Sequence, residues 1–275
     1  MRLVDLNDAV KRVASLPRVE MPDSASRSAR TWLGRKHADG AVHEPATLAA
    51  LLVMMDEAPP QPNFFDLGAL FGYFTLFVLD NAPGAKVWAF EAHPAGPRDL
   101  NTILGPGDAM VVHAMMTDID AEDVDIWVSG FNLYERPKGG WCRLQEEPGA
   151  MKPRGANNEG RGFALLTLMT LDHFCEATGV GPDFMKVDVE AYQARALRGG
   201  LCMITEHKPQ IVIELHDPEK IARMGTTNQK TVQPLFDLGY RGYWCGNFRA
   251  GDATFEEVDH INEDRDRLSL MVFTT

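Results

Sequence analysis

Three things are scarce in this sequence: closely spaced cysteines, long apolar runs and positive charge. The four cysteines are far apart, without a C-x-x-C pair, at Cys142, Cys175, Cys202 and Cys245. Such spacing argues against a disulfide scaffold or a zinc knuckle and predicts reduced thiols. No run approaches the roughly 20 apolar residues of a membrane span. The charges in MRLVDLNDAVKRV are too closely spaced for a signal-peptide core, so we expect a cytoplasmic protein without a membrane partner.

The shortage of positive charge limits the partners. Lys and Arg number 27 against 39 Asp and Glu, a formal net charge of -12. Phosphate binding needs clustered Lys and Arg, so we expect no nucleic-acid partner. The acidic balance favours a small neutral or cationic acceptor molecule as substrate. The chain of 275 residues, 45% of them hydrophobic, is long enough to bury a sizeable core.

The first 60 residues are predicted to be a helical extension or cap. Leu48, Leu51, Leu52 and Met55 follow helical spacing, and Pro59-Pro60-Gln61-Pro62 then ends the pattern. We therefore divide the chain into a helical segment, 1–60, and a larger domain, 61–275. The helical N-terminus could serve a homodimer, although no residue specifies one.

Beyond residue 60, short apolar runs alternate with helical ones, which predicts a doubly wound, mostly parallel α/β sheet of seven strands. The predicted strands are 63–67, 86–90, 109–114, 184–189, 210–215, 240–245 and 268–273. The predicted helices are 73–81, 95–104, 171–178, 191–201 and 228–238. Glycine, proline and asparagine crowd the interval 119–162, which we interpret as an irregular insertion. Ligands of such sheets bind beyond the carboxyl ends of the strands.

One stretch, DLGALFGYFT (residues 66–75), joins the first strand to the next helix and carries the strongest functional signal. Gly68 and Gly72 can take positive φ and let a ligand approach the backbone. The stretch has only G-x-x-x-G, an incomplete dinucleotide fingerprint, and no phosphate-binding lysine follows Gly72. Glu91 ends the second strand, where an acid can accept hydrogen bonds from both hydroxyls of a ribose. This pattern suits a nucleoside better than a pyrophosphate.

The sequence resembles the FkbM family of class I S-adenosylmethionine-dependent methyltransferases. Five marks appear in the family's order over about 66–216: DLGALFGYFT, FEAHP, TLD, KVDVE and IELH, which begin at residues 66, 90, 170, 186 and 213. The resemblance implies a Rossmann-like methyltransferase domain that binds S-adenosyl-L-methionine. The family's usual residues are replaced at Leu70, Ala92 and Gln193, where the last change removes a carboxylate near the presumed reaction centre.

The resemblance also implies which residues hold the cofactor. Gly68, Ala69 and Gly72 would approach its methionine part, and Asp66 would lie beside its amino group. Glu91 would hold the ribose. The adenine would be flanked by Thr117 and Asp118, with Asp118 as an acceptor for the exocyclic amine. The structural alternative for Asp66 is a charge stabilised by the dipole of the following helix.

For catalysis, an alcohol acceptor needs a base within hydrogen-bond reach. Asp188 is the first candidate, and Lys186 and Glu190 alternate with it along the strand. A lysine within reach would keep Asp188 ionised. His216 is the second candidate base, and its structural alternative is a packed histidine that donates to a carbonyl. Glu214 in its apolar strand needs a partner, for which we suggest Lys186.

These residues leave several functions open. Asp188, Glu190, Glu214 and His216 could hold a divalent metal, but an ion-pair network explains them equally, and we do not expect a metal. The preferred function is O-methylation of a hydroxyl on a sugar or glycosylated small molecule, a preference that comes from the resemblance. The alternatives are N-methylation of a small-molecule amine or amide, and cofactor binding without transfer, to which Gln193 lends weight. A dehydrogenase is disfavoured because the third glycine is absent.

Overall fold

The computed structural model describes residues 1–36, 42–105, 107, 109–129, 132–135, 142–143 and 161–275. Within them, eight strands form a main sheet in the order β12-β11-β13-β10-β9-β1-β2-β3. Its strands are β1 (Asn63–Leu67), β2 (Lys86–Glu91), β3 (Ala109–His113), β9 (Phe184–Val187), β10 (Gln210–Leu215), β11 (Arg241–Cys245), β12 (Glu256–Val258) and β13 (Ser269–Thr274). The seven predicted strands are all present, and β12 adds an eighth at the edge.

The order of the strands creates a switch point beside β1. The chain runs from β1 outward through β2 to β3, then returns to the other side of β1 with β9 and β10. These five strands are parallel, and β13, β11 and β12 continue the sheet in antiparallel pairing. The carboxyl ends of β1, β2, β9 and β10 therefore meet at one edge, where a doubly wound sheet binds its ligands.

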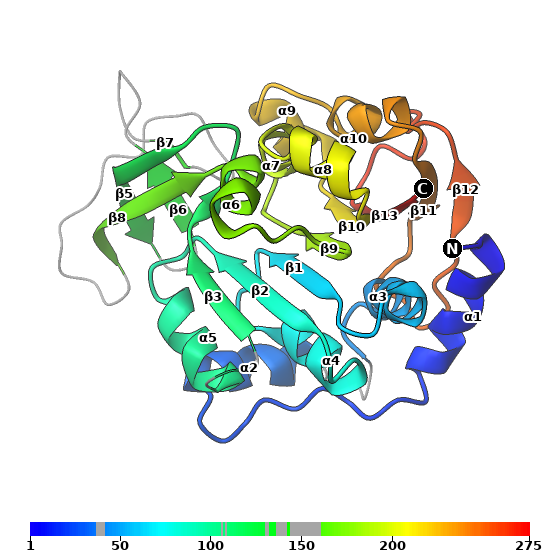
Figure 1. Cartoon of the computed structure of the whole chain (residues 1–275), viewed down its shortest axis with the longest axis horizontal. Coiled ribbons are helices and arrows are strands. Elements are labelled where there is room, and N and C mark those ends of the chain that lie inside the picture. The colour runs from blue at the N-terminus through cyan, green and yellow to red at the C-terminus, as the bar shows by residue number, and fades with distance from the viewer. Residues whose placement is uncertain (37–41, 106, 108, 130–131, 136–141, 144–160) are drawn as a thin grey trace.

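Helices cover both faces of this sheet (Figure 1). They are α1 (Leu3–Val13), α2 (Arg27–Lys36), α3 (Pro45–Glu57), α4 (Tyr73–Asn81), α5 (Gly96–Leu104), α6 (Leu171–Thr178), α7 (Gln193–Arg198), α8 (Leu201–His207), α9 (Pro218–Arg223) and α10 (Asn228–Asp237). Alternate residues of each strand point to opposite faces. Thus Phe64 packs in the core with α1, α3 and α4, whereas Phe65 packs in the core with α6, α7 and α8.

The prediction of a single helix over 191–201 was wrong, because two glycines divide this segment into two helices. The structure has α7 and α8 instead, separated by Gly199 and Gly200. A Cβ on Gly199 would lie 1.9 Å from the carbonyl oxygen of Thr117, and one on Gly200 would lie 2.9 Å from Leu171 Cδ1. The corner between the helices is thus packed too closely for any side chain.

The interval predicted to be irregular contains a second sheet. Its strands are β4 (Met115–Met116), β5 (Ala121–Ser129), β6 (Asn132–Glu135), β7 (Cys142–Arg143) and β8 (Arg161–Met169), in the order β4-β8-β5-β6-β7. The prediction of an irregular insertion was therefore wrong where β5 pairs with β8 over most of its length. The sequence does not indicate this pairing, because β5 and β8 lie far apart in the chain and the segment between them is rich in turn residues. Residues 144–160, which include three of the glycines in this interval, lie outside the described residues.

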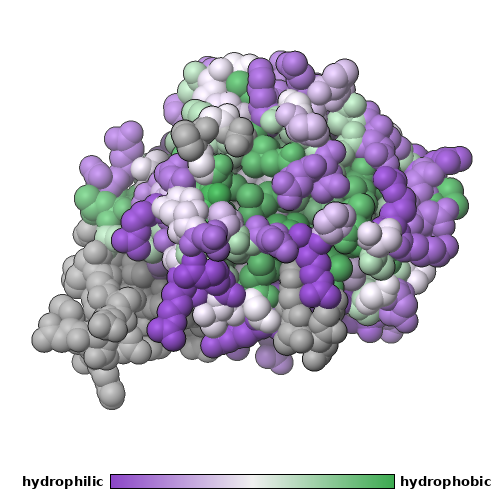
Figure 2. All heavy atoms as spheres, turned by 90° about the horizontal axis from the view of Figure 1, so that it is seen from below, coloured by the Kyte–Doolittle hydropathy of each residue, from purple (hydrophilic) through white to green (hydrophobic). Residues whose placement is uncertain are grey.

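Hydrophilic side chains cover much of the face shown in Figure 2, and hydrophobic ones gather toward its middle. None of the helices in the described part of the chain is long and apolar enough to cross a membrane. Within residues 1–60, α3 packs on β10 and β13 of the main sheet and α1 packs on α3, so that both helices share a buried core with β1, β9 and β10. The division at residue 60 stays a prediction.

Candidate active site

The turn after β1 brings three left-handed residues together. Gly68, Leu70 and Gly72 have φ of 78°, 49° and 74°. A Cβ on Gly68 would lie 1.9 Å from the carbonyl oxygen of Asp188, so the chain's own backbone makes the close approach at this glycine. The amides of Gly68 and Ala69 both donate to the carbonyl of Phe90, at 2.9 and 3.1 Å. The turn is thereby fixed against the ends of both neighbouring strands.

Asp66, the residue before the last of β1, carries a fully buried carboxylate. Its Oδ2 accepts a hydrogen bond of 2.8 Å from the hydroxyl of Thr75 in the first turn of α4. Its Oδ1 accepts no hydrogen bond from the residues that the structure describes, and Lys186 Nζ lies 3.4 Å away. Asp66 therefore anchors the helix that follows the turn and also belongs to the charge cluster of β9.

Glu91 at the end of β2 is turned toward the same loop. One carboxylate oxygen accepts from the amide of Leu70 at 2.8 Å, and the other accepts from the amide of His93 at 2.7 Å. Burial raises its pKa, which these two amide bonds partly offset. A Cβ on Gly96 would lie 2.2 Å from Glu91 Cγ, so this glycine is what allows the carboxylate its position. Each carboxylate oxygen has a further lone pair available for a ligand hydroxyl.

Thr117 and Asp118 follow β4 at the far side of this edge. Thr117 is buried, and Asp118 accepts hydrogen bonds from Arg195 Nε at 2.6 Å and Arg198 Nη2 at 2.8 Å. Burial raises the pKa of Asp118, but the hydrogen bonds from the two arginines lower it by more, so the net effect is a lowered pKa. The carboxylate is thus bound to α7, and its predicted contact with adenine stays a prediction.

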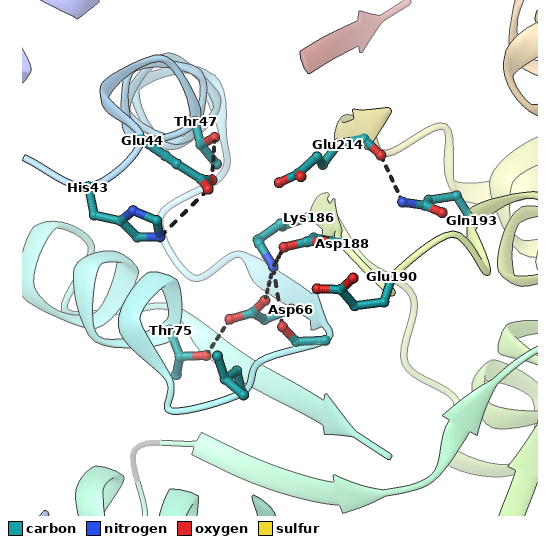
Figure 3. A network of polar contacts seen from close by, with 12 residues as sticks. His43, Glu44, Thr47, Asp66, Thr75, Lys186, Asp188, Glu190, Gln193 and Glu214 are labelled. Carbon is teal, nitrogen blue, oxygen red and sulfur yellow. Dashed lines mark hydrogen bonds and ion pairs between the residues drawn. The ribbon is translucent and has the colours of Figure 1, made fainter. Parts of the chain in front are cut away.

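Lys186 lies at the centre of the polar side chains at the ends of β9 and β10, which we call the acceptor side (Figure 3). Its Nζ is 3.4 Å from Asp66 Oδ1 and 3.8 Å from Asp188 Oδ2, and it donates to the carbonyl of Gly68 at 3.3 Å. Burial lowers the pKa of this lysine, but the charges of Asp66 and Asp188 raise it more. The lysine therefore stays charged and links the end of β1 to the end of β9. The side chain of Asp188 is 26% exposed, whereas Asp66 is fully buried.

Glu190 leaves the face that it was predicted to share with Lys186 and Asp188, because β9 ends at Val187 and Glu190 has φ of 52°. Its carboxylate pairs with Lys220 of α9 and lies 3.5 Å from His216 Nε2. Hydrogen bonds from His216 and Lys220 lower its pKa far below the ordinary value, against the effect of burial.

The suggested pairing of Glu214 with Lys186 was wrong in its partner. Glu214 accepts from Arg249 Nη2 at 3.1 Å, and the same guanidinium binds Glu44 Oε1 at 3.2 Å. Both carboxylates are buried, at 6% and 5% exposure, and burial followed by the charge of Asp188 raises the pKa of each. Lys186 acts on Glu214 only through its charge.

Sequence reasoning missed Glu44 and Arg249 as members of this site. Glu44 precedes α3 with φ of 49°, and Thr47 donates to it at 3.3 Å. His43 Nε2 lies 3.6 Å from its other oxygen. Arg249 follows β11 in an irregular segment. The one local signal was a charged residue just before Pro45, which marks a helix start but not a position beside Glu214.

Gln193 was singled out as a departure but not as a contact. It is 1% exposed, and its amide nitrogen lies 2.8 Å from the carbonyl oxygen of Glu214 and 2.9 Å from His216 Nδ1. His216 itself is 4% exposed, and its Nε2 lies 4.0 Å from Asp188 Oδ1. The structure therefore brings the four predicted catalytic residues, Lys186, Asp188, Glu190 and His216, to one edge.

Asp188, Glu214 and His216 each offer a ligand atom, and these atoms lie within 4.8 Å of one another. Two of the three residues are buried. Lys186 and Arg249 already supply positive charge to Asp188 and Glu214. The geometry thus accommodates either a cation or the ion-pair network that the described side chains form.

Comparison with known proteins supports the family. Residues 66–241, more than half of the chain, match the model of the methyltransferase FkbM domain. A curated relative, the AMB antimetabolite synthetase AmbE of Pseudomonas aeruginosa, is 26% identical over 230 residues, which cover 74% of this chain. The chain spans about a tenth (10%) of the length of that relative.

Two solved structures are also similar. The FkbM methyltransferase of Methylobacillus flagellatus has 13% identity and a TM-score of 0.45, with 97% of this chain and 58% of that one covered. An O-methyltransferase of Bacillus cereus in complex with SAH has 10% identity and a TM-score of 0.45, with both chains fully covered (100%). On the family match over 66–241, this chain belongs to the FkbM methyltransferase family.

Proposed function

We propose that the protein transfers the methyl group of S-adenosylmethionine to a hydroxyl of a sugar or glycosylated small molecule, with Asp188 as the group that receives the proton. The observation that carries this proposal is the contrast in exposure among the clustered carboxylates. Asp66, Glu44 and Glu214 are buried, whereas the side chain of Asp188 is 26% exposed and lies beside the charged Lys186. A base must reach the acceptor, and among these four Asp188 is the accessible one. Glu190 is more exposed, at 53%, but hydrogen bonds from His216 and Lys220 lower its pKa far below the ordinary value, which makes it a weak base.

The residues at the β1 and β2 ends suit the cofactor. Glu91 offers free lone pairs to ribose hydroxyls, and Asp66 Oδ1 is a buried acceptor without a hydrogen bond. Gly68, Ala69 and Gly72 would approach the methionine part, and Thr117 and Asp118 would flank the adenine. When bound, the cofactor supplies an electrophilic methyl group. The chain's own contribution is to fix both partners so that the acceptor oxygen lies in line, at about 3–3.5 Å.

Lys186 has a separate role in this scheme. Its charge lies 3.8 Å from Asp188 and 3.4 Å from Asp66, so this one ammonium group pairs with both carboxylates. The Asp188 carboxylate can accept a hydrogen bond from the acceptor hydroxyl and orient its oxygen. It then takes the proton as the new bond to carbon forms.

The class of acceptor follows from the family resemblance and from the site's charge. Five carboxylates (Glu44, Asp66, Asp188, Glu190 and Glu214) meet three side-chain cations (Lys186, Lys220 and Arg249). This excess of negative charge disfavours a phosphorylated or nucleic-acid acceptor. It also supports a second candidate, N-methylation of a small-molecule amine. The similarity to part of an antimetabolite synthetase is in keeping with a small-molecule acceptor of either kind.

Calorimetric titration with S-adenosylhomocysteine tests the cofactor half first. We expect micromolar binding by the wild type and a loss of roughly a hundredfold in Glu91→Ala, because two ribose hydrogen bonds to a charged acceptor disappear. Glu206→Ala, an exposed glutamate on α8, is the matched control and should bind normally. Absence of binding by the wild type at millimolar ligand would contradict the proposed function.

Transfer of a labelled methyl group to a panel of sugars, glycosides and amines then separates the two acceptor classes. Product from hydroxyl acceptors, lost in Asp188→Asn with S-adenosylhomocysteine binding retained, would support O-methylation. Product from amines alone would favour the second candidate.

A further inference from the structure

Gln193 contacts His216 in a way that fixes which imidazole nitrogen carries the proton. The amide nitrogen of Gln193 lies between two groups, the carbonyl oxygen of Glu214 at 2.8 Å and His216 Nδ1 at 2.9 Å. A carbonyl oxygen can only accept, so the group of Gln193 that faces it must be the NH₂. The second hydrogen of the same NH₂ then points to Nδ1. Nδ1 must accept it with a lone pair.

The reverse orientation of the Gln193 amide is unfavourable. It would place the amide oxygen 2.8 Å from the carbonyl oxygen of Glu214. It would also move the NH₂ to the position of Oε1, which is buried and has no hydrogen-bond partner among the described residues. Two buried donors would then be unsatisfied in place of one acceptor, and each unsatisfied group is costly. The orientation with NH₂ toward Nδ1 is therefore the stable one.

The other side of the imidazole gives the same answer independently. His216 Nε2 faces Glu190 Oε2 at 3.5 Å and Asp188 Oδ1 at 4.0 Å. Ionised carboxylates only accept hydrogen bonds, so a proton on Nε2 is favoured there. A carboxylate oxygen of Glu214 also lies within 4.8 Å of a ring nitrogen of His216. Further out, Lys220 of α9 pairs with Glu190, and Asn228 of α10 donates to the backbone carbonyl of His216 at 2.8 Å.

We infer that Gln193 is a positioning residue that holds neutral His216 as the Nε2–H tautomer, which makes the imidazole a hydrogen-bond donor and leaves Asp188 to accept the proton of the substrate. The first part stands on the contacts of Gln193 alone. The second part rests on the proposed methyl transfer to a hydroxyl.

In that reaction, the O–H bond of the acceptor breaks and its proton moves to a carboxylate oxygen of Asp188. A carbon–oxygen bond forms as the carbon–sulfur bond of the sulfonium breaks, and the bonding electrons stay on sulfur. His216 contributes its Nε2–H to the carboxylates and takes no proton, since its lone pair is bound by Gln193. A metal at Asp188, Glu214 and His216 would need a free imidazole lone pair, which this tautomer offers only after the bond to Gln193 is lost.

The tautomer can be read directly from the ring nitrogens. We would record two-bond proton–nitrogen correlation spectra of ¹⁵N-labelled wild-type protein at about pH 8.5, two units above the ordinary imidazole pKa of about 6.5. The protein has 8 histidines, and the signals of His216 are assigned by their loss in His216→Gln. We expect Nδ1 at the shift of an unprotonated nitrogen and Nε2 at that of a protonated one, in roughly tenfold excess or more over the other tautomer. A protonated Nδ1 in the wild type would overturn the inference, whatever the variants do.

Two variants then show whether Gln193 is the cause. Gln193→Met keeps a similar volume but removes both hydrogen bonds, and it should reduce the tautomer preference severalfold. Gln193→Glu presents a carboxylate to Nδ1 while Glu190 and Asp188 still face Nε2, and we expect the Nδ1 signal to move to the shift of a protonated nitrogen. An unchanged spectrum in both variants would remove Gln193 from the explanation. If Gln193→Glu does not fold, the wild-type spectrum and Gln193→Met decide alone.

These spectra need neither cofactor nor acceptor, so their failure is distinct from that of the proposed function. A wild-type Nε2–H tautomer without S-adenosylhomocysteine binding would keep the inference about Gln193 and reject the methyl-transfer role. Binding and transfer with an Nδ1–H tautomer would keep the function and return His216 as the base.

Discussion

The two halves of the site are built differently. On the cofactor half, contacts join residues close in sequence: Leu70 binds Glu91 across 21 positions, and Thr75 binds Asp66 across 9. On the acceptor half they join distant segments, such as Arg249 and Glu44, which are 205 positions apart. The cofactor half is therefore a property of one strand-turn-helix unit and its neighbour. The acceptor half exists only once the whole sheet and its cap have assembled.

Lys186 joins the two halves, and its removal should have the largest effect. Lys186→Met keeps the stem but leaves Asp66 and Asp188 without their cation, and Asp66 is fully buried. Breaking a buried pair in this way costs about 3–5 kcal/mol of the free energy of unfolding. We expect this loss in urea titrations, together with loss of methyl transfer.

The control is Lys11→Met, which breaks a pair between side chains that are 79% and 62% exposed. It should cost less than about 1 kcal/mol. Equal stability of the two variants would show that Lys186 does not compensate the buried charge.

The second link between the halves is the close approach of Gly68 to Asp188. The backbone of Asp188 occupies the position that a side chain on Gly68 would need. Gly68→Ala combines a φ of 78° with a Cβ placed 1.9 Å from the Asp188 carbonyl oxygen. Gly105→Ala is matched, because its φ is 70° but, apart from its chain neighbours, no atom in the described part of the chain lies within 4 Å of the added Cβ. We expect both to lose stability through strain, and Gly68→Ala to lose about 1–3 kcal/mol more because of overpacking. Thermal unfolding of the two variants measures the difference, and similar melting shifts would contradict the tight approach.

The division between halves also explains what the sequence could reveal. The positions of Asp66, Gly68 and Glu91 were predictable, because each lies where an apolar run meets a turn. The reason for Gly68 was not predictable, because its closest neighbour is the carbonyl of Asp188, just after β9, rather than a ligand. Sequence spacing shows that a side chain is absent but does not show what fills the space.

The acceptor half was predictable only as a set of strand-end residues. Lys186 and His216 could be placed at the edge because their strands are apolar and parallel. Their hydrogen bonds could not, because Arg249 and Glu44 come from irregular segments whose positions depend on tertiary packing. The same limit applies to β5 and β8, whose pairing across the glycine-rich interval has no local signature.

Two glutamates of the acceptor half should respond to pH in opposite directions. Burial, then the charges of Asp188 and Glu44, raises the pKa of Glu214, so the folded state keeps a proton that the unfolded state loses above about pH 4.3. The free energy of unfolding should therefore decrease as pH rises from about 4.3 to the raised pKa of Glu214 in the folded protein. In Glu214→Gln this decrease should be smaller. The pKa of Glu190 is lowered, so its contribution is present above about pH 4.3 and is lost in acid.

Glu190→Gln should accordingly be less stable than wild type near neutral pH, with the difference vanishing at low pH. Because its side chain is 53% exposed, we expect a loss of no more than roughly 1 kcal/mol. Urea midpoints at a series of pH values measure both variants. Parallel pH curves for Glu214→Gln and wild type would show that Glu214 does not titrate in this range.

Substitution of Asp118 should have the smallest effect, and it tests whether this residue belongs to the cofactor half. Asp118→Asn and Arg198→Gln weaken the same bridge from opposite sides, and the side chains of both residues are partly exposed, at 23% and 56%. Each should therefore cost no more than roughly 1 kcal/mol of stability.

If Asp118 also accepts from the adenine amine, only Asp118→Asn weakens S-adenosylhomocysteine binding, by about tenfold for one lost hydrogen bond. We expect that asymmetry in calorimetric titrations. Equal stability losses with unchanged affinity in both variants would instead make Asp118 an anchor for α7, and the cofactor half would then end at Glu91.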